Sequence, residues 1–246
     1  PNIQNNQTQT VLVALCRNAD LRQEGHQYFV QLLALILEKG GNPNIACKSG
    51  CTALHLLLYC GDIDSAVLLL KCGARLNCYW DKPQHIETFW DDTNLPTPQV
   101  LPLDMIHHEQ HTTLRLLSAI EHPQDWVANS CRPACMQCKS LFGTFCRQHH
   151  CRHCGRLICG QCSLNSLDVS YFPPSFHECL DNGGNHKKGF RVCCVCEDIL
   201  VARKKRKAFE SYDHDASALD ERNESVLTTI SAGEVSSVVR EEYSQA

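Results

Sequence analysis

The stretch RQHHCRHCGRLICGQC, residues 147–162, contains two Cys-x-x-Cys pairs in close succession. One further pair lies on each side of it, which gives eight paired cysteines: Cys135, Cys138, Cys151, Cys154, Cys159, Cys162, Cys193 and Cys196. Thiolates with this spacing can share one tetrahedral zinc ion, and two pairs fill its coordination shell. Disulfides are the alternative, but such short spacings are more typical of metal or redox chemistry. The spacing therefore predicts two closed, structural sites with Zn²⁺ as the cofactor.

The residues around these pairs form a second pattern. Arg147 precedes the run His149-His150-Cys151-Arg152, and the triplet Arg191-Val192-Cys193 follows later in the chain. This combination resembles the FYVE zinc finger, a family that binds phosphatidylinositol 3-phosphate on endosomal membranes. The intervening residues and the cysteine spacing agree with the family together, which makes the resemblance specific.

The resemblance implies a small cross-brace finger with short β-hairpins and a C-terminal helix. One ion would be held by Cys135, Cys138, Cys159 and Cys162, and the other by Cys151, Cys154, Cys193 and Cys196. Interleaved sites tie distant loops together. Metal binding would then supply much of the folding free energy of this segment.

The resemblance also implies a lipid headgroup face made of Arg147, His149, His150, Arg152 and Arg191. Guanidinium forks suit a phosphomonoester, and imidazoles offer a donor and an acceptor to inositol hydroxyls. Two positions depart from the family. Gln148 replaces a basic residue, and Asn129 ends a stretch, WVAN, where the family has Trp-x-x-Asp. Each change is expected to weaken lipid binding, and the alternative is that the face is ordinary solvated surface.

A membrane-insertion element is expected between the first two cysteine pairs. Residues 141–146, LFGTFC, align with the family's exposed turret loop. Thr144 and Phe145 would enter the bilayer, since an aromatic ring gains much from leaving water. Phe142 is expected to pack inward, and the alternative is that both rings are core.

The first half of the chain contains an internal repeat. Leu35, Leu37, Gly40 and Asn44 recur 33 residues later as Leu68, Leu70, Gly73 and Asn77, which is the period of ankyrin repeats. The stretch GCTALH at 50–55 resembles the opening of an ankyrin helix pair. LPLD at 101–104 predicts a third opening, with its second helix over 112–120, and TVLV at 10–13 a degenerate first one. An unrelated helical bundle is the alternative.

The predicted fold is therefore an α-helical ankyrin-like repeat stack followed by the cross-brace finger. We expect about three repeats with insertions over 1–122, the finger over 123–209, and an acidic, disordered tail over 210–246. Between the third and fourth cysteine pairs, Ser163 to Phe190 is expected to be a long loop that brings Lys187 and Lys188 towards the basic face. No apolar run approaches the roughly 20 residues that a membrane-spanning helix needs.

Charge separates along the chain, because basic residues concentrate in 126–207 while the flanking parts are acidic. The run Arg203-Lys204-Lys205-Arg206-Lys207 would attract anionic lipid. Nuclear import or RNA binding are alternatives for such a run. Its place directly after the finger favours the membrane, and no nucleic acid partner is expected.

Three classes of function are compatible with these patterns. The favoured one is a cytoplasmic adaptor, peripheral on endosomal membranes, whose finger binds phosphatidylinositol 3-phosphate while the repeats recruit a protein. The second is a FYVE-related finger that has lost lipid specificity and binds a protein such as a small GTPase. The third, a RING-type finger in ubiquitin transfer, is disfavoured because no histidine occupies a ligand position. No nucleophile–base pair or open metal site is evident, so an enzyme is not expected.

Overall fold

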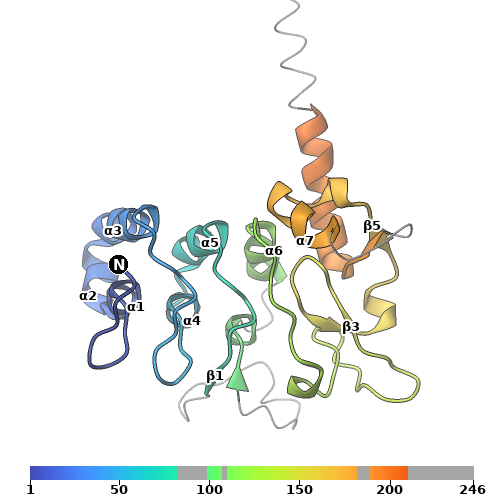
Figure 1. The fold of residues 1–246 in the computed structure, drawn as a ribbon, viewed down its shortest axis with the longest axis horizontal. Coiled ribbons are helices and arrows are strands. Elements are labelled where there is room, and N and C mark those ends of the chain that lie inside the picture. The colour runs from blue at the N-terminus through green and yellow to red at the C-terminus, as the bar shows by residue number, and fades with distance from the viewer. Residues whose placement is uncertain (82–98, 107–109, 182–188, 210–246) are drawn as a thin grey trace, which may run out of the picture. The chain divides into compact units, whose positions relative to one another are not determined.

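A computed structural model describes residues 1–81, 99–106, 110–181 and 189–209 of the 246 (Figure 1). The chain forms a compact unit, Pro1–Leu200, and a second unit that begins at Val201. In Figure 1 the helices of the first unit stand side by side and are followed by a region of short strands and turns. This is the predicted architecture of a helical repeat stack followed by a small finger.

The stack is built from short helices that pair with their neighbours. In chain order these are α1 Val11–Arg17, α2 Ala19–Glu24, α3 His26–Glu38, α4 Ala53–Tyr59, α5 Ile63–Lys71 and α6 Gln110–Ser118. α4 packs against α1 and α5, and α5 packs against α6. α4 is buried at five of its seven residues, and α1 and α5 supply the surfaces that cover it. The fully buried leucines Leu57 and Leu69 lie at the centre of this arrangement.

The repeat period is visible in the backbone. α3 and α5 each end before a glycine in the left-handed region, Gly40 with φ +80° and Gly73 with φ +87°. A left-handed residue at this position ends a helix without the strain that a Cβ would cause. The prediction that these glycines terminate the repeat helices is confirmed.

The outer units differ from a regular repeat. The third opening, expected to start a helix at residues 101–104, is a 3₁₀ turn, η2 Pro102–Met105. The strands β1 Trp80–Asp81 and β2 Gln99–Val100 pair antiparallel beside it. Most of the expected insertion between them, residues 82–98, lies outside the described part of the chain, and so do 107–109.

The described part of the finger contains two short antiparallel strand pairs and several 3₁₀ turns. β3 His149–His150 pairs with β4 Leu157–Ile158, and β5 Ser166–Leu167 pairs with β6 Phe190–Arg191. The turns are η3 Asn129–Cys131, η4 Gly160–Cys162, η5 Val169–Tyr171 and η6 Pro174–Phe176. The short helix α7 His177–Asp181 follows η6, and helical backbone resumes over 194–209.

The expectation of a long loop after Ser163 is wrong for the part that the structure describes. Phe172, Phe176 and Phe190 pack with ring centroids 5.7 and 6.0 Å apart, and His153 lies 5.5 Å from Phe176. This aromatic cluster buries rings that were too widely spaced in the sequence to form a periodic pattern. Lys187 and Lys188 lie outside the described residues.

Candidate metal centres and the adjoining basic face

The eight paired cysteines gather into two groups of four. Within each group the sulfur atoms lie within 4.8 Å of one another, and the groups are Cys135/Cys138/Cys159/Cys162 and Cys151/Cys154/Cys193/Cys196. These are the interleaved sets that the cross-brace implies. Four thiolates in this spacing match the closed tetrahedral shell of structural zinc. The donor set therefore fits two Zn²⁺ ions, and neither shell leaves a position open for a substrate.

The first group lies near the surface, since Cys138 is exposed and Cys162 is partly exposed. Backbone amides help to compensate its charge. The N–H groups of Gln137 and Cys159 donate to Cys135 Sγ at 3.4 and 3.3 Å. Cys138 Sγ lies 3.3 Å from the hydroxyl of Ser140. Solvent and the main chain thus share the stabilisation of this site.

The second group is buried at all four cysteines. Arg156 lies beside it, 5% exposed, and donates to Cys154 Sγ and Cys193 Sγ at 3.3 Å each. Burial disfavours the cation, but the neighbouring thiolates outweigh it and raise the pKa of the Arg156 guanidinium. Four thiolates around one Zn²⁺ leave a net charge of about −2, which this cation partly offsets. Sequence reasoning missed this role, because an arginine two residues after a cysteine has no distinctive spacing.

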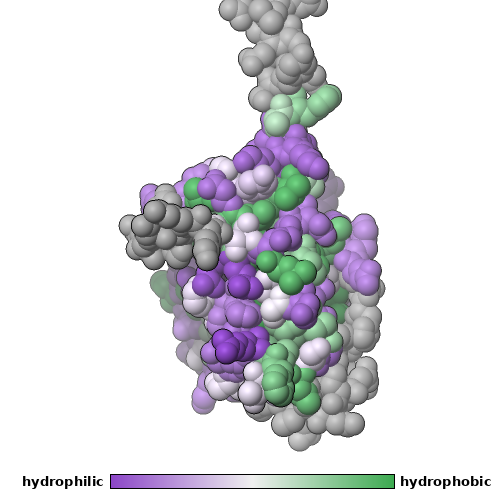
Figure 2. Space-filling model, turned by 90° about the vertical axis from the view of Figure 1, so that its right-hand side faces the viewer, coloured by the Kyte–Doolittle hydropathy of each residue, from purple (hydrophilic) through white to green (hydrophobic). Residues whose placement is uncertain are grey.

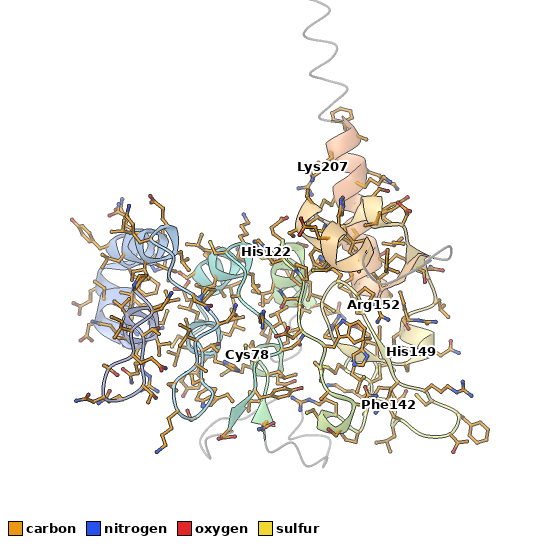
Figure 3. The ribbon with its side chains drawn as sticks, in the orientation of Figure 1. Cys78, His122, Phe142, His149, Arg152 and Lys207 are labelled. Carbon is orange, nitrogen blue, oxygen red and sulfur yellow. The ribbon has the colours of Figure 1, made fainter. Side chains whose placement is uncertain are left out.

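The residues predicted to face a headgroup come from two segments, 147–152 and β6, that meet at one edge of the finger. β3 carries His149 and His150, while the backbone N–H of Arg152 donates to the carbonyl of Arg191 at 2.9 Å and joins β3 to β6. Burial, together with Arg191 and Arg147, lowers the pKa of the His149 imidazole. Figure 3 shows Arg152 and His149 in the same region of the finger. The fold thus gathers the five predicted residues, and all of them remain partly or fully exposed.

Trp126 forms a platform under two of these residues, which the expected site did not include. Its ring stacks on His150 with centroids 5.0 Å apart, and the Arg152 guanidinium carbon lies 4.1 Å from its centroid. His150 Nε2 lies 2.8 Å from the carbonyl of Val127, and Arg152 donates to the carbonyl of His150 at 3.0 Å. The cation–π contact and these hydrogen bonds fix the direction of both side chains. The tryptophan of the WVAN stretch was the available signal.

The two departures from the family pattern contact each other. The side-chain amide of Gln148 donates to the backbone carbonyl of Asn129 at 3.1 Å. The amide adds no charge to the face, whereas a lysine or arginine would. The arginines of the predicted face are therefore Arg147, Arg152 and Arg191.

The loop between the first two cysteine pairs projects an apolar tip. Phe145 is fully exposed, and Leu141 is 61% exposed. Reciprocal backbone hydrogen bonds between Gly143 and Cys146, 3.0 and 3.2 Å long, hold the turn closed. Phe142 instead packs against a core of Leu101, Val127 and Leu157. Figure 2 shows that this end of the molecule mixes hydrophilic surface with small hydrophobic areas.

The basic run 203–207 lies on helical backbone in the second unit, and most of its side chains are exposed. Within the described residues, no helix combines the length and the apolar character that crossing a bilayer requires.

Comparison with known proteins identifies both parts of the chain. Residues 125–202 match the family model of the FYVE zinc finger, and residues 49–80 match that of the ankyrin repeat. Rabankyrin-5 from Homo sapiens is 29% identical over 152 residues, which are 62% of this chain and 10% of that protein. Rabankyrin-5 from Mus musculus is 35% identical over the same length and the same shares. The chain thus spans about a tenth of the length of these relatives.

One solved structure adds a match to the finger alone. The solution structure of the LM5-1 FYVE domain from Leishmania major is 29% identical. The match covers 32% of this chain and 79% of that domain, with a TM-score of 0.23. The assignment of the finger therefore rests on the family model and on the two cysteine groups.

Proposed function

Because the chain contains a FYVE zinc finger that follows an ankyrin repeat stack, we propose that it is a membrane-targeting adaptor. In this proposal the finger binds phosphatidylinositol 3-phosphate on the cytoplasmic face of endosomal membranes. The stack recruits a protein partner. Both matched domains are binding modules, so the proposal includes no catalytic step.

The observation that carries the proposal is the cluster of cations on one edge of a metal-held finger. Arg147 and Arg152 lie in the same stretch of chain as His149, and the carbonyl of Arg191 accepts from the backbone N–H of Arg152 at 2.9 Å. A phosphomonoester brings between one and two negative charges and several acceptor oxygens, which guanidinium groups bind with matched geometry. The inositol hydroxyls would use the partly exposed imidazoles of His149 and His150.

The exposed tip supports a membrane as the source of this phosphate. Phe145 lies on the loop that immediately precedes Arg147 and contacts no core in the described structure, being fully exposed. Burying an aromatic ring in the interfacial region of a bilayer would favour binding to a lipid surface over a free phosphate. Thr144 is exposed beside it and would accompany it into the headgroup layer.

The second candidate is a finger that binds a protein such as a small GTPase. Its support is the Gln148–Asn129 contact, which replaces a family cation and a family carboxylate with two amides. Loss of one charge would weaken headgroup binding without changing the finger's fold.

Liposome flotation of the full chain tests the proposal. We expect binding to vesicles with phosphatidylinositol 3-phosphate to exceed binding to vesicles of equal charge made with phosphatidylserine or phosphatidylinositol 4-phosphate. Arg152→Ala should lower the affinity about tenfold, which is the effect of losing one charged hydrogen-bonding group. Arg17→Ala, which removes the same charge from α1, is the matched control and should have no effect. Equal binding to all anionic vesicles, unaffected by Arg152→Ala, would refute the proposal.

A further inference from the structure

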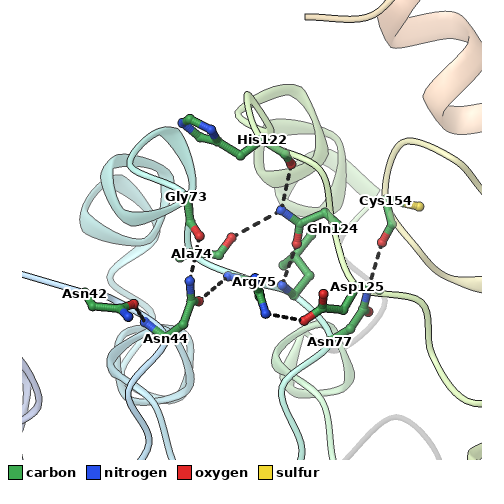
Figure 4. A network of polar contacts seen from close by, with 11 residues as sticks. Asn42, Asn44, Gly73, Ala74, Arg75, Asn77, His122, Gln124, Asp125 and Cys154 are labelled. Carbon is green, nitrogen blue, oxygen red and sulfur yellow. Dashed lines mark hydrogen bonds and ion pairs between the residues drawn. The ribbon is translucent and has the colours of Figure 1, made fainter. Parts of the chain in front are cut away.

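Residues 74–79, which follow α5, contact the segment 124–129 that leads into the finger, and Figure 4 shows their contacts with Gln124 and Asp125. The side chain of Gln124 accepts from the backbone N–H of Leu76 at 2.8 Å and donates to the carbonyl of Ala74 at 3.3 Å. Arg75 forms an ion pair with Asp125 at 2.6 Å. These contacts fix the segment immediately before Trp126.

Asn77 also contacts the zinc finger itself. Its side-chain amide donates to the backbone carbonyl of Asp125 and, at 3.1 Å, to that of Cys154. Asn44, one repeat earlier, donates in the same way to Gly73 of the next unit at 2.9 Å. Asp125 follows α6 as Gly73 follows α5, and the additional contact with Cys154 joins the stack to the finger. Gly155 permits the approach, since a Cβ there would overlap Asp125 and Asn77.

The segment is also held on the other side of Trp126. The backbone N–H of Ala128 donates to the Tyr79 hydroxyl at 3.0 Å, and that of Val127 donates to the carbonyl of Gly155 at 3.0 Å. Val127 is fully buried in a core that includes Leu101 from the stack side and Leu157 from β4. A buried ion pair between Arg132 and Asp104 joins the same two parts of the chain. Rigid contacts therefore flank Trp126 on both sides.

We propose that the segment 74–79 of the ankyrin stack positions the headgroup site, with Tyr79, Asn77 and Arg75 acting through Trp126. Trp126 contacts His150 and Arg152, so its placement decides where these two side chains point. The stack residues themselves contact no headgroup, and they are positioning residues. This inference rests on the proposed lipid function, and it adds that the affinity of the finger depends on the repeat stack before it. A protein bound near Tyr79 would change lipid affinity through the same contacts.

The test uses the full chain and the variant Tyr79→Phe, which removes one hydroxyl and keeps the ring. Titration with soluble dibutanoyl phosphatidylinositol 3-phosphate should give an affinity about three- to tenfold lower, the effect of one lost hydrogen bond. Tyr28→Phe, at an exposed tyrosine on α3, is the matched control and should bind like the parent chain. In parallel, the NMR signal of the Trp126 indole N–H should shift in Tyr79→Phe and stay in place in Tyr28→Phe.

Asp125→Asn provides a second, independent variant for the case that Tyr79→Phe loses zinc. It removes the charge that pairs with Arg75. The matched control is Asp64→Asn, which removes the charge from a comparable exposed ion pair, Asp64 on α5 with Arg115 on α6, whose N···O distance is 2.5 Å. Only the first should lower lipid affinity and move the Trp126 signal. Parent-like affinity and an unmoved signal in Tyr79→Phe and Asp125→Asn, with zinc retained, would overturn the inference.

The two proposals fail in different ways. If the parent chain does not bind the lipid, the proposed function fails. The Trp126 signal then still decides whether the stack sets the position of that ring.

Discussion

The ankyrin stack and the zinc finger are held together by different forces within one compact unit. The stack buries leucines on facing helices, with Leu57, Leu69 and Leu70 fully inaccessible. The finger has short strands of two residues each, and its eight thiolates converge on two points. Apolar burial is spread over many contacts, whereas a metal site concentrates stability in a few bonds. The two regions should therefore fail under different conditions.

The two regions nevertheless share a core. Leu101, Val127 and Leu157 meet where they join, so loss of order in one region reaches the other through this contact. Zinc removal should therefore disturb mainly the finger, and a mutation in the leucine core should disturb mainly the stack. Either effect should extend no further than the core that the two regions share.

The largest expected effect is that of zinc removal. A strong chelator should abolish the β3–β4 and β5–β6 strand pairs, because the cysteines would take up protons and the metal bonds that tie these loops together would be lost. Helices α1, α3 and α4 should keep their structure, since they contact no cysteine group. NMR spectra before and after chelation, with zinc measured by elemental analysis, would show this. Loss of all helical signals together would mean that the stack has no stability of its own. Strand pairs that survive chelation would show that the metal does not hold the finger together.

The next prediction weakens the apolar core of the stack and leaves the metal sites intact. Leu57→Ala should lower the free energy of unfolding by about 2–5 kcal/mol, the usual cost of a cavity at a fully buried leucine. The zinc content should stay at two ions per chain. Leu32→Ala, at a leucine 42% exposed on α3, is the control and should have a much smaller effect. Urea unfolding followed by circular dichroism measures the change, and an equal loss in both variants would contradict the assigned core.

A smaller effect should appear as the pH falls. His55 is fully buried between Thr52, Val100 and Trp80, and desolvation lowers the pKa of its imidazole to about 4. The unfolded chain takes up this proton near pH 6.5, before the folded chain does, so stability declines as the pH falls below 6.5. At pH 5.5 the loss is about 1 kcal/mol. An NMR titration of the ring should show it neutral at that pH, and a midpoint near 6.5 would contradict the buried environment.

Much of the finger could be predicted from the sequence because its functional residues occur in short, recognisable motifs. Each cysteine pair, the run around His149 and Arg152, and the turret residue Phe145 can be recognised from residues adjacent in the chain. The structure groups the cysteines as the cross-brace implies, and it exposes Phe145 while Phe142 packs inward. The role of Trp126 as a platform was missed, because it stacks on His150, which lies 24 residues later in the chain, and no sequence motif predicts such a contact.

The segment after Ser163, expected to be a loop, shows what the sequence could not predict. Phe172, Phe176 and Phe190 have no periodicity, and they are buried against one another and against His153, which contacts Cys196. Arg156 is similar, because its two thiolate partners lie 2 and 37 residues away. Neither feature has a signature that a sequence could show.

The sequence by itself determined the four cysteine pairs, the repeat period and the glycines that end its helices, because pair spacing, repetition and helix ends can be read along the chain. The tertiary structure alone decided that stack and finger share a core and that Asn77, Tyr79 and Arg75 hold the segment around Trp126. Those contacts join residues about 50 to 80 positions apart. Side chains so distant meet only after both parts have folded, so their pairing follows from packing and leaves no pattern in the sequence.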